Sequence, residues 1–196
     1  MNPLDRFVVL LLHPQAATEE LYEQPSVETA FVFVSVYAVA SGLHATLTVV
    51  LFTEIPRFYI SSFLITAAAA YVQWIVLACV LRVGAALFGG AGTLVKALGY
   101  TGLATAPLVV TTGLSILGLF VLPLFAEGDP IETVTAANAL LSIAGMVWGL
   151  PGFLCYYGVR NGELLESYKA AIIVAAAFCL ALAFMALTSG DGVLFE

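Results

Sequence analysis

Four polar side chains recur along one face of a long apolar stretch near the N-terminus, where they could contact a polar solute. Tyr37, Ser41, His44 and Thr48 are separated by four, three and four residues, which is the spacing of one face of a helix. Polar groups at membrane depth often mark a solute pathway. They equally suit close packing, in which hydroxyl groups form hydrogen bonds between helices. Both interpretations stay open.

Two later apolar stretches carry polar stripes of the same kind. Thr101 and Thr105 are one helical turn apart, as are Asn138 and Ser142. If the three stripes face one another, a small transporter or channel would use His44 and Asn138 as polar contacts, and this is the alternative function. None of the 13 acidic residues lies within a charge-free apolar stretch, so no acidic proton relay is predicted.

Basic residues and glycines flank the apolar stretches in positions where they could bind anions. The basic residues are Arg82, Lys96, Arg160 and Lys169, and the glycines are Gly89, Gly90 and Gly92. Cationic side chains beside a membrane attract anionic headgroups, and free backbone amides in a glycine-rich turn can bind phosphate. We therefore expect contact with lipid headgroups or with an acidic partner. Simple snorkelling of Arg82 toward the headgroups is the plainer alternative.

Catalytic, cofactor and metal sites are not predicted. The sequence contains no ATPase phosphate loop, no zinc-peptidase motif and no serine-hydrolase motif, and it has only two histidines and three scattered cysteines. A net charge of -7 with six basic residues argues against nucleic acid as a partner, because no basic patch is available. We expect a protein without enzymatic activity whose partners are membrane lipids, a second copy or another membrane protein.

The elements that position these residues are membrane-spanning helices. The chain is 62% hydrophobic and 10% charged, with five long windows that lack Asp, Glu, Lys and Arg. About 20 helical residues cross the hydrocarbon core. We predict an all-α, polytopic bundle of five transmembrane helices in one membrane domain over residues 1–196, with a short interfacial helix at 3–13. The predicted spans are about 29–53, 58–88, 94–126, 132–158 and 168–188.

The third span is predicted to be bent and closely packed. Pro107 should kink it, because proline lacks the backbone N–H and its ring clashes with the preceding turn. Gly99 and Gly102 offer a small surface on which another helix can approach closely. Thr93 is the expected N-cap at the start of the span.

The distribution of basic residues predicts the orientation. With the N-terminus in the cytoplasm, only Arg57 of the six basic residues lies on the outer side, as the positive-inside rule favours. Five spans then place the C-terminus outside. We expect a multi-pass protein of the cell membrane.

The run FGGAGTLVKALGYTGLATAP resembles the signature of the Yip1 domain family. In that signature a glycine pair and a small residue precede an apolar helix that carries a glycine-tyrosine pair and a proline. The matching residues here are Gly89, Gly90, Gly92, Gly99, Tyr100 and Pro107. A second region, from Trp148 through Gly158 to Ser167 and Ala170, is similar to the family's fourth span, its short cytoplasmic loop and the start of its fifth span.

The resemblance implies a non-catalytic membrane protein with five spans and a cytoplasmic N-terminus. Eukaryotic family members bind Rab-type small GTPases and take part in membrane trafficking, but their Asp-Leu-Tyr-Gly-Pro element does not occur among residues 1–28. The short, acidic, lysine-poor chain is more similar to a prokaryotic member from a haloarchaeon. We therefore expect a scaffold that organises lipid or recruits a partner.

Overall fold

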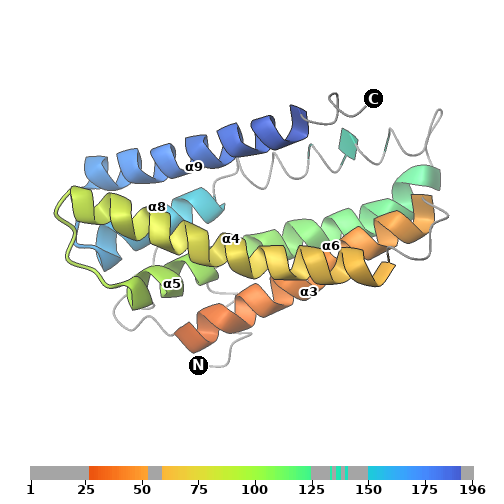
Figure 1. Cartoon of the computed structure of the whole chain (residues 1–196), viewed down its shortest axis with the longest axis horizontal. Helices are drawn as coiled ribbons and strands as arrows, with labels where there is room; N and C mark the ends of the chain where they lie inside the picture. The colour runs from red at the N-terminus through yellow and green to blue at the C-terminus, as the bar shows by residue number, and fades with distance from the viewer. Residues whose placement is uncertain are drawn as a thin grey trace.

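The computed structural model describes residues 27–52, 59–124 and 150–190 of the chain, together with positions 133, 136, 137 and 140. These residues are helical apart from short turns, which confirms the all-α prediction for this part of the chain (Figure 1). In order, the elements are α3 (Val27–Phe52), α4 (Tyr59–Leu87), α5 (Leu94–Leu103), α6 (Ala106–Val121), the 3-10 turn η2 (Leu122–Leu124), α8 (Leu150–Gly162) and α9 (Ser167–Gly190). The predicted interfacial helix at 3–13 lies outside the described residues.

Three segments are long and apolar enough to cross a bilayer. They are α3, α4 and the combined segment Leu94–Leu124, which includes α5, α6 and η2. Large apolar side chains on these segments are exposed, for example Ile60 and Ile65 on α4. A helix that is apolar all round needs an apolar environment, and a bilayer supplies it without leaving backbone groups unpaired. The described residues thus support three of the predicted spans, while α8 and α9 overlap the regions predicted as the fourth and fifth and extend a few residues beyond them.

The third predicted span is broken rather than gently bent. Helix α5 ends at Leu103 and α6 begins at Ala106, with Pro107 in the first turn of α6. Proline is well suited to a first helical turn because its missing N–H is not needed there. The Thr105 hydroxyl donates to the Gly102 carbonyl at 2.6 Å. The kink predicted from Pro107 is therefore present as a two-residue interruption.

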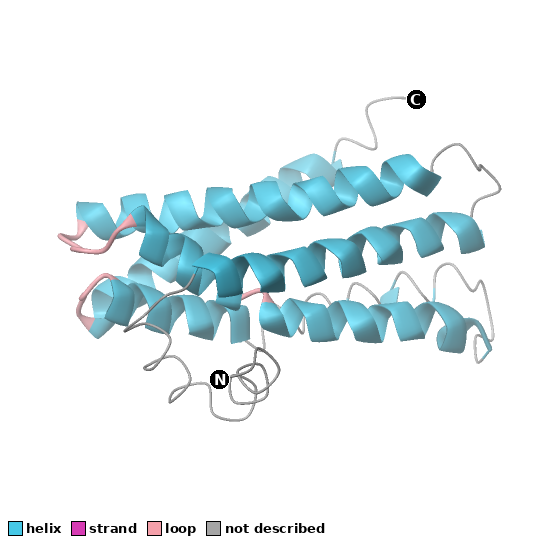
Figure 2. Cartoon of the chain, turned by 90° about the horizontal axis from the view of Figure 1, so that it is seen from below, coloured by secondary structure: helices cyan, strands magenta, loops and turns pink. Residues whose placement is uncertain are grey.

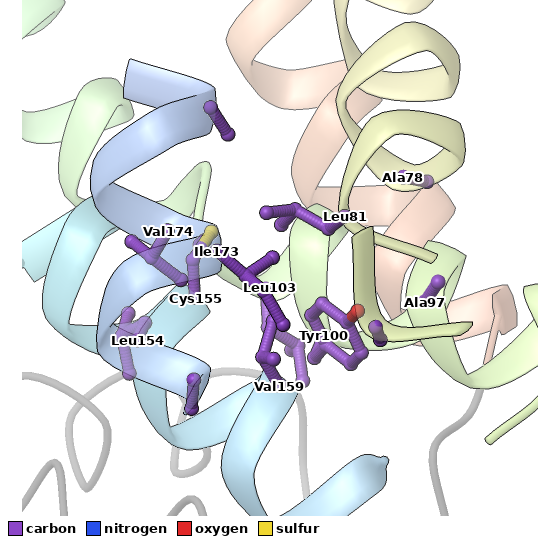
Figure 3. Packing of buried hydrophobic residues seen from close by; sticks show 14 of the residues in the cluster. Ala78, Leu81, Ala97, Tyr100, Leu103, Leu154, Cys155, Val159, Ile173 and Val174 are labelled. Carbon is purple, nitrogen blue, oxygen red and sulfur yellow. The ribbon is translucent and has the colours of Figure 1, made fainter. Parts of the chain in front are cut away.

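Helix α5 lies in the middle of the packing. It contacts α3, α4 and α8, and its Gly102 lies so close to Ala30 of α3 that an added Cβ would overlap that residue. The predicted small-residue surface is thus a helix contact within the chain. Figure 3 shows buried side chains of this cluster packed together, and it labels Leu81 of α4, Tyr100 and Leu103 of α5, Val159 of α8 and Ile173 of α9 among them.

Two turns lie at the same end of the bundle, as Figure 2 shows. Residues 88–93 connect α4 to α5, and residues 163–166 connect α8 to α9. We call this end of the molecule, with both turns, the loop end. The Ala91 N–H donates to the Glu163 carbonyl at 3.0 Å, so the two turns are joined directly through their backbones.

Candidate functional site

The α4–α5 turn is built by glycine at its start and by a threonine cap at its end. Gly89 has a φ of 83°, in the left-handed region that glycine adopts without steric cost. The Gly90 N–H donates to the Ala85 carbonyl at 2.8 Å and closes the end of α4. Thr93 is the N-cap of α5, since its side chain accepts from the Lys96 N–H. The N-cap predicted from the sequence is confirmed.

A carboxylate from the α8–α9 turn occupies this glycine turn. Oε2 of Glu163 lies 3.2 Å from Nη1 of Arg82 and accepts from the Gly92 N–H at 2.9 Å. The Glu163 side chain is completely buried, whereas 26% of the Arg82 side chain is exposed. Arg82 comes from α4, Gly92 from the α4–α5 turn and Glu163 from the far turn. One carboxylate oxygen therefore joins the α8–α9 turn to α4 and to the turn that follows α4.

The second oxygen of the same carboxylate is not satisfied. Among the described residues, Oε1 of Glu163 has no hydrogen-bond partner although it is buried. Burial raises the pKa of Glu163 above the ordinary carboxyl range, while Arg82, the Gly92 amide and the more distant Lys96 each lower it in part. The charged form of this group is thus only partly compensated.

Gly92 is needed because the carboxylate takes the space of a side chain. A Cβ added at Gly92 would lie 2.7 Å from Oε1 of Glu163, which is too close for any non-bonded contact. This observation changes the phosphate hypothesis for the glycine turn. The Gly92 amide, which could have bound an external phosphate, is already occupied by an anion of the chain itself.

Tyr100 connects the two sequence regions that carry the family resemblance. Its side chain is fully buried, and its ring lies against Gly158 and Gly162 of α8 (Figure 3). A Cβ added at Gly158 would lie 2.5 Å from Cγ of Tyr100. Glycine on α8 therefore lets α5 approach through the tyrosine ring. The two regions that resemble the family thus contact each other, through Tyr100 in the first and Gly158 in the second.

The predicted basic residues are all placed around the loop end. Arg82 pairs with Glu163, and Lys96 is close enough to act on the pKa of the same carboxyl. Arg160 lies in the last turn of α8, where a cation is favoured by the helix dipole. Nζ of Lys169 lies 3.3 Å from Oε2 of Glu166. All four lie on helix ends next to the two turns of the loop end, and two of them already contact carboxylates.

Hydroxyl groups in the predicted polar stripes bond to their own helices. Ser41 donates to the Tyr37 carbonyl at 2.8 Å, Thr48 to the His44 carbonyl at 2.9 Å and Thr101 to the Ala97 carbonyl at 2.6 Å. Nε2 of His44 is buried with no hydrogen-bond partner among the described residues. Asn138 and Ser142 lie outside the described residues, so a path through the three stripes stays a prediction.

Glu163 is the residue that sequence reasoning missed. Arg82 was interpreted as a headgroup contact or a snorkelling side chain, and no carboxylate was assigned to it. A signal existed in the sequence, since Glu163 follows Asn161 and Gly162 in a short connection between two apolar stretches. That signal did not distinguish Glu163 from Glu166, which lies in the same connection.

Comparison with protein families identifies the family of this chain. The sequence model of the Yip1 domain matches residues 8–189, which is nearly the whole chain. The chain belongs to the Yip1 domain family. The match includes both the glycine turn and the α8–α9 turn, so the contact between Glu163 and Gly92 lies inside the Yip1 domain.

Membership together with the three apolar segments makes this chain a membrane protein of the Yip1 type. Comparison with curated proteins and comparison with solved structures gave no significant match. The features of this Yip1 domain that go beyond the family description therefore follow from its own residues. The most developed of these is the buried carboxylate at the loop end.

Proposed function

We propose that this Yip1 domain is a non-catalytic scaffold that spans the cell membrane five times and organises anionic lipid at its loop end. The N-terminus and the loop end face the cytoplasm in this proposal, and the C-terminus lies outside. Family membership and the three apolar segments support the membrane setting. The positive-inside rule supports the orientation, because four of the six basic residues lie near the loop end.

One observation supports the lipid proposal: α4, α5, α8 and α9 each carry a basic residue near the turns of the loop end. Among the described residues, neither Lys96 nor Arg160 forms an ion pair, so their charges are available to a ligand. Exposed apolar side chains accompany them, with Leu87 in α4 and Leu164 in the α8–α9 turn. Cations beside exposed apolar groups suit the boundary between headgroups and acyl chains.

Lipid selectivity tests this proposal. Spin-labelled phosphatidylglycerol and phosphatidylcholine are compared in vesicles that contain the full chain, and the relative association of the anionic lipid is measured at pH 8. We expect preference for phosphatidylglycerol, and we expect the triple variant Lys96→Gln, Arg160→Gln, Lys169→Gln to lose most of it. Arg57→Gln, predicted to lie on the outer side, is the matched control. Equal selectivity in the triple variant and the wild type would refute the headgroup proposal.

Orientation is tested by chemical labelling of intact cells. Single cysteines are introduced at Ala91 of the loop end and at Asp129, which lies between the third and fourth predicted spans, in a background with the three native cysteines replaced. A membrane-impermeant maleimide should label Asp129→Cys in intact cells and Ala91→Cys only after lysis. The reverse pattern would mean that the loop end faces outward.

Recruitment of an acidic protein at the same end, including any small GTPase, is a further proposal that the family role suggests. It requires the same basic residues, so the triple variant would test it in the same membranes. The alternative transport function around His44 and Asn138 stays a prediction.

A further inference from the structure

The two carboxylate oxygens of Glu163 differ in their contacts, and this difference suggests that the pair with Arg82 is a switch. Both contacts to the carboxylate fall on Oε2, the Arg82 guanidinium at 3.2 Å and the Gly92 N–H at 2.9 Å. Oε1 is buried and has no partner among the described residues. An ionised carboxylate normally accepts several hydrogen bonds when it is buried, and an incompletely satisfied one is costly. Burying ionised Glu163 thus costs free energy, which its contacts with Arg82 and Gly92 offset only in part.

Arg82 differs from Glu163 because part of its side chain is exposed to solvent. About a quarter of its side chain is exposed (26%), while none of the Glu163 side chain is. Arginine has a long flexible stem and a planar group that binds phosphate through two parallel hydrogen bonds. If its contact with Glu163 were lost, the guanidinium could turn toward the headgroups while the carboxyl stayed inside.

The groups that face Glu163 are few and come from identified elements. Arg82 lies on α4, and Lys96 and Tyr100 lie on α5; each of these three interacts electrostatically with the carboxyl. Of the other basic residues near this turn, Arg160 of α8 is exposed, and Lys169 of α9 is paired with Glu166. Only Glu163 among these groups carries a buried negative charge, so adding one proton to it changes the balance of the whole cluster.

We propose that Glu163 is a proton-operated latch: ionised, it retains Arg82 inside the loop end, and protonated, it releases Arg82 to bind the phosphate of an anionic lipid. This inference rests on the proposed function for the lipid and on the geometry of Arg82, Gly92 and Glu163 for the latch. Protonation removes the ion pair but leaves a neutral carboxyl that can still accept from the Gly92 N–H. The turns therefore stay joined while the cation is freed.

The electrostatic setting agrees with this assignment. Burial raises the pKa of Glu163, so its proton is taken up at a higher pH than that of an ordinary surface carboxyl. The phosphate diester of phosphatidylglycerol stays ionised throughout the same pH range. A change in lipid association on acidification would thus report the protein and not the lipid.

The test measures spin-labelled phosphatidylglycerol association against pH, from 8 down to about 4.5, with the full chain in phosphatidylcholine vesicles. We expect association with the wild type to rise several-fold as the pH falls. Glu163→Gln, which imitates the protonated carboxyl, should associate strongly at pH 8 and show little pH dependence. Arg82→Gln should stay at the wild-type pH 8 level throughout, because the other basic residues of the loop end remain, and Arg82→Lys should retain a rise. Glu166→Gln is the matched control from the same turn and should behave as the wild type does.

The result that overturns the latch is a wild-type curve that is flat with pH, or a Glu163→Gln curve that coincides with the wild type at pH 8. If Glu163→Gln does not fold, the pH response of the wild type and its loss in Arg82→Gln decide the question. Failure of the proposed function looks different, since no variant would prefer phosphatidylglycerol over phosphatidylcholine at any pH.

In that event the latch is judged by an intramolecular readout. At pH 8, adding Arg82→Gln should lower the melting temperature of the wild type more than it lowers that of the Glu163→Gln variant. At acidic pH the two losses should be equal. A difference that is absent at pH 8 or unchanged at acidic pH would refute the latch.

Discussion

Glu163 and Glu166 lie three residues apart in one short turn and each contacts a basic side chain, but the two ion pairs have different roles. Arg82 and Glu163 are 81 positions apart in the sequence, and the carboxylate is fully buried. Lys169 and Glu166 are three positions apart, and 64% of the Glu166 side chain is exposed. The first pair joins α4 to the α8–α9 turn, and the second lies at the start of α9. Burial, and not residue type or the presence of a partner, decides which pair the fold depends on.

The largest effect should come from removing the cation of the buried pair. Arg82→Gln leaves the Glu163 charge with the Gly92 amide and the more distant Lys96, and a buried charge that loses its partner typically costs about 3 kcal/mol or more. We expect the free energy of unfolding in detergent micelles at pH 8 to fall by roughly 3 kcal/mol. Lys169→Gln is the control from the exposed pair. A loss of the same size in both variants would remove the distinction between the two pairs.

A smaller but still large effect should follow from filling the space of the carboxylate. Gly92→Ala places a Cβ 2.7 Å from Oε1 of Glu163, so the carboxylate must move away from the amide it accepts from. Overpacking of this kind costs about 1–3 kcal/mol. Gly113→Ala is a matched control, because a Cβ at Gly113 meets nothing within 4 Å. Equal stability of the two alanine variants in the same unfolding titration would mean that the turn can shift freely.

Local patterns explain which parts of this arrangement the sequence could predict. Charge-free windows predicted the helices because the hydrophobic signal is carried by neighbouring residues. Pro107 predicted the interruption of the third span, and Thr93 predicted the start of α5, because proline geometry and helix capping act within one turn. These predictions depend on no contact between distant segments.

The buried ion pair could not be predicted in the same way. Arg82 had several available interpretations from the sequence, and its partner is determined by how α4 and the α8–α9 turn meet. Glu163 and Glu166 have the same side chain and similar neighbours in sequence, so only the packing of the turn against Gly92 selects one of them. The polar stripe of α3 differs from the buried pair, because its hydroxyls bond to carbonyls of their own helix. The sequence alone left the role of these hydroxyls open.

The dependence of stability on pH should separate the two carboxylates by its sign. Burial raises the pKa of Glu163, so its contribution to stability is fully present below the ordinary carboxyl pKa and is lost as the pH rises through the raised value. The difference in melting temperature, wild type minus Glu163→Gln, should therefore become less favourable to the wild type between about pH 4 and pH 8. Melting curves of both proteins over this range provide the measurement. A difference that grows in favour of the wild type with rising pH would indicate that the ion pair outweighs burial.

The smallest effect is expected at Glu166, where the sign is opposite. Hydrogen bonds from Tyr168 and Lys169 lower the pKa of Glu166, so any contribution to stability is present above the ordinary carboxyl pKa and is lost as the pH falls through the lowered value. Solvent and salt screen this exposed pair. Glu166→Gln should consequently melt within error of the wild type at pH 8, in low salt and in high salt. A clear loss that disappears in high salt would show that the exposed pair also secures the start of α9, and the contrast between the two carboxylates would then be one of degree.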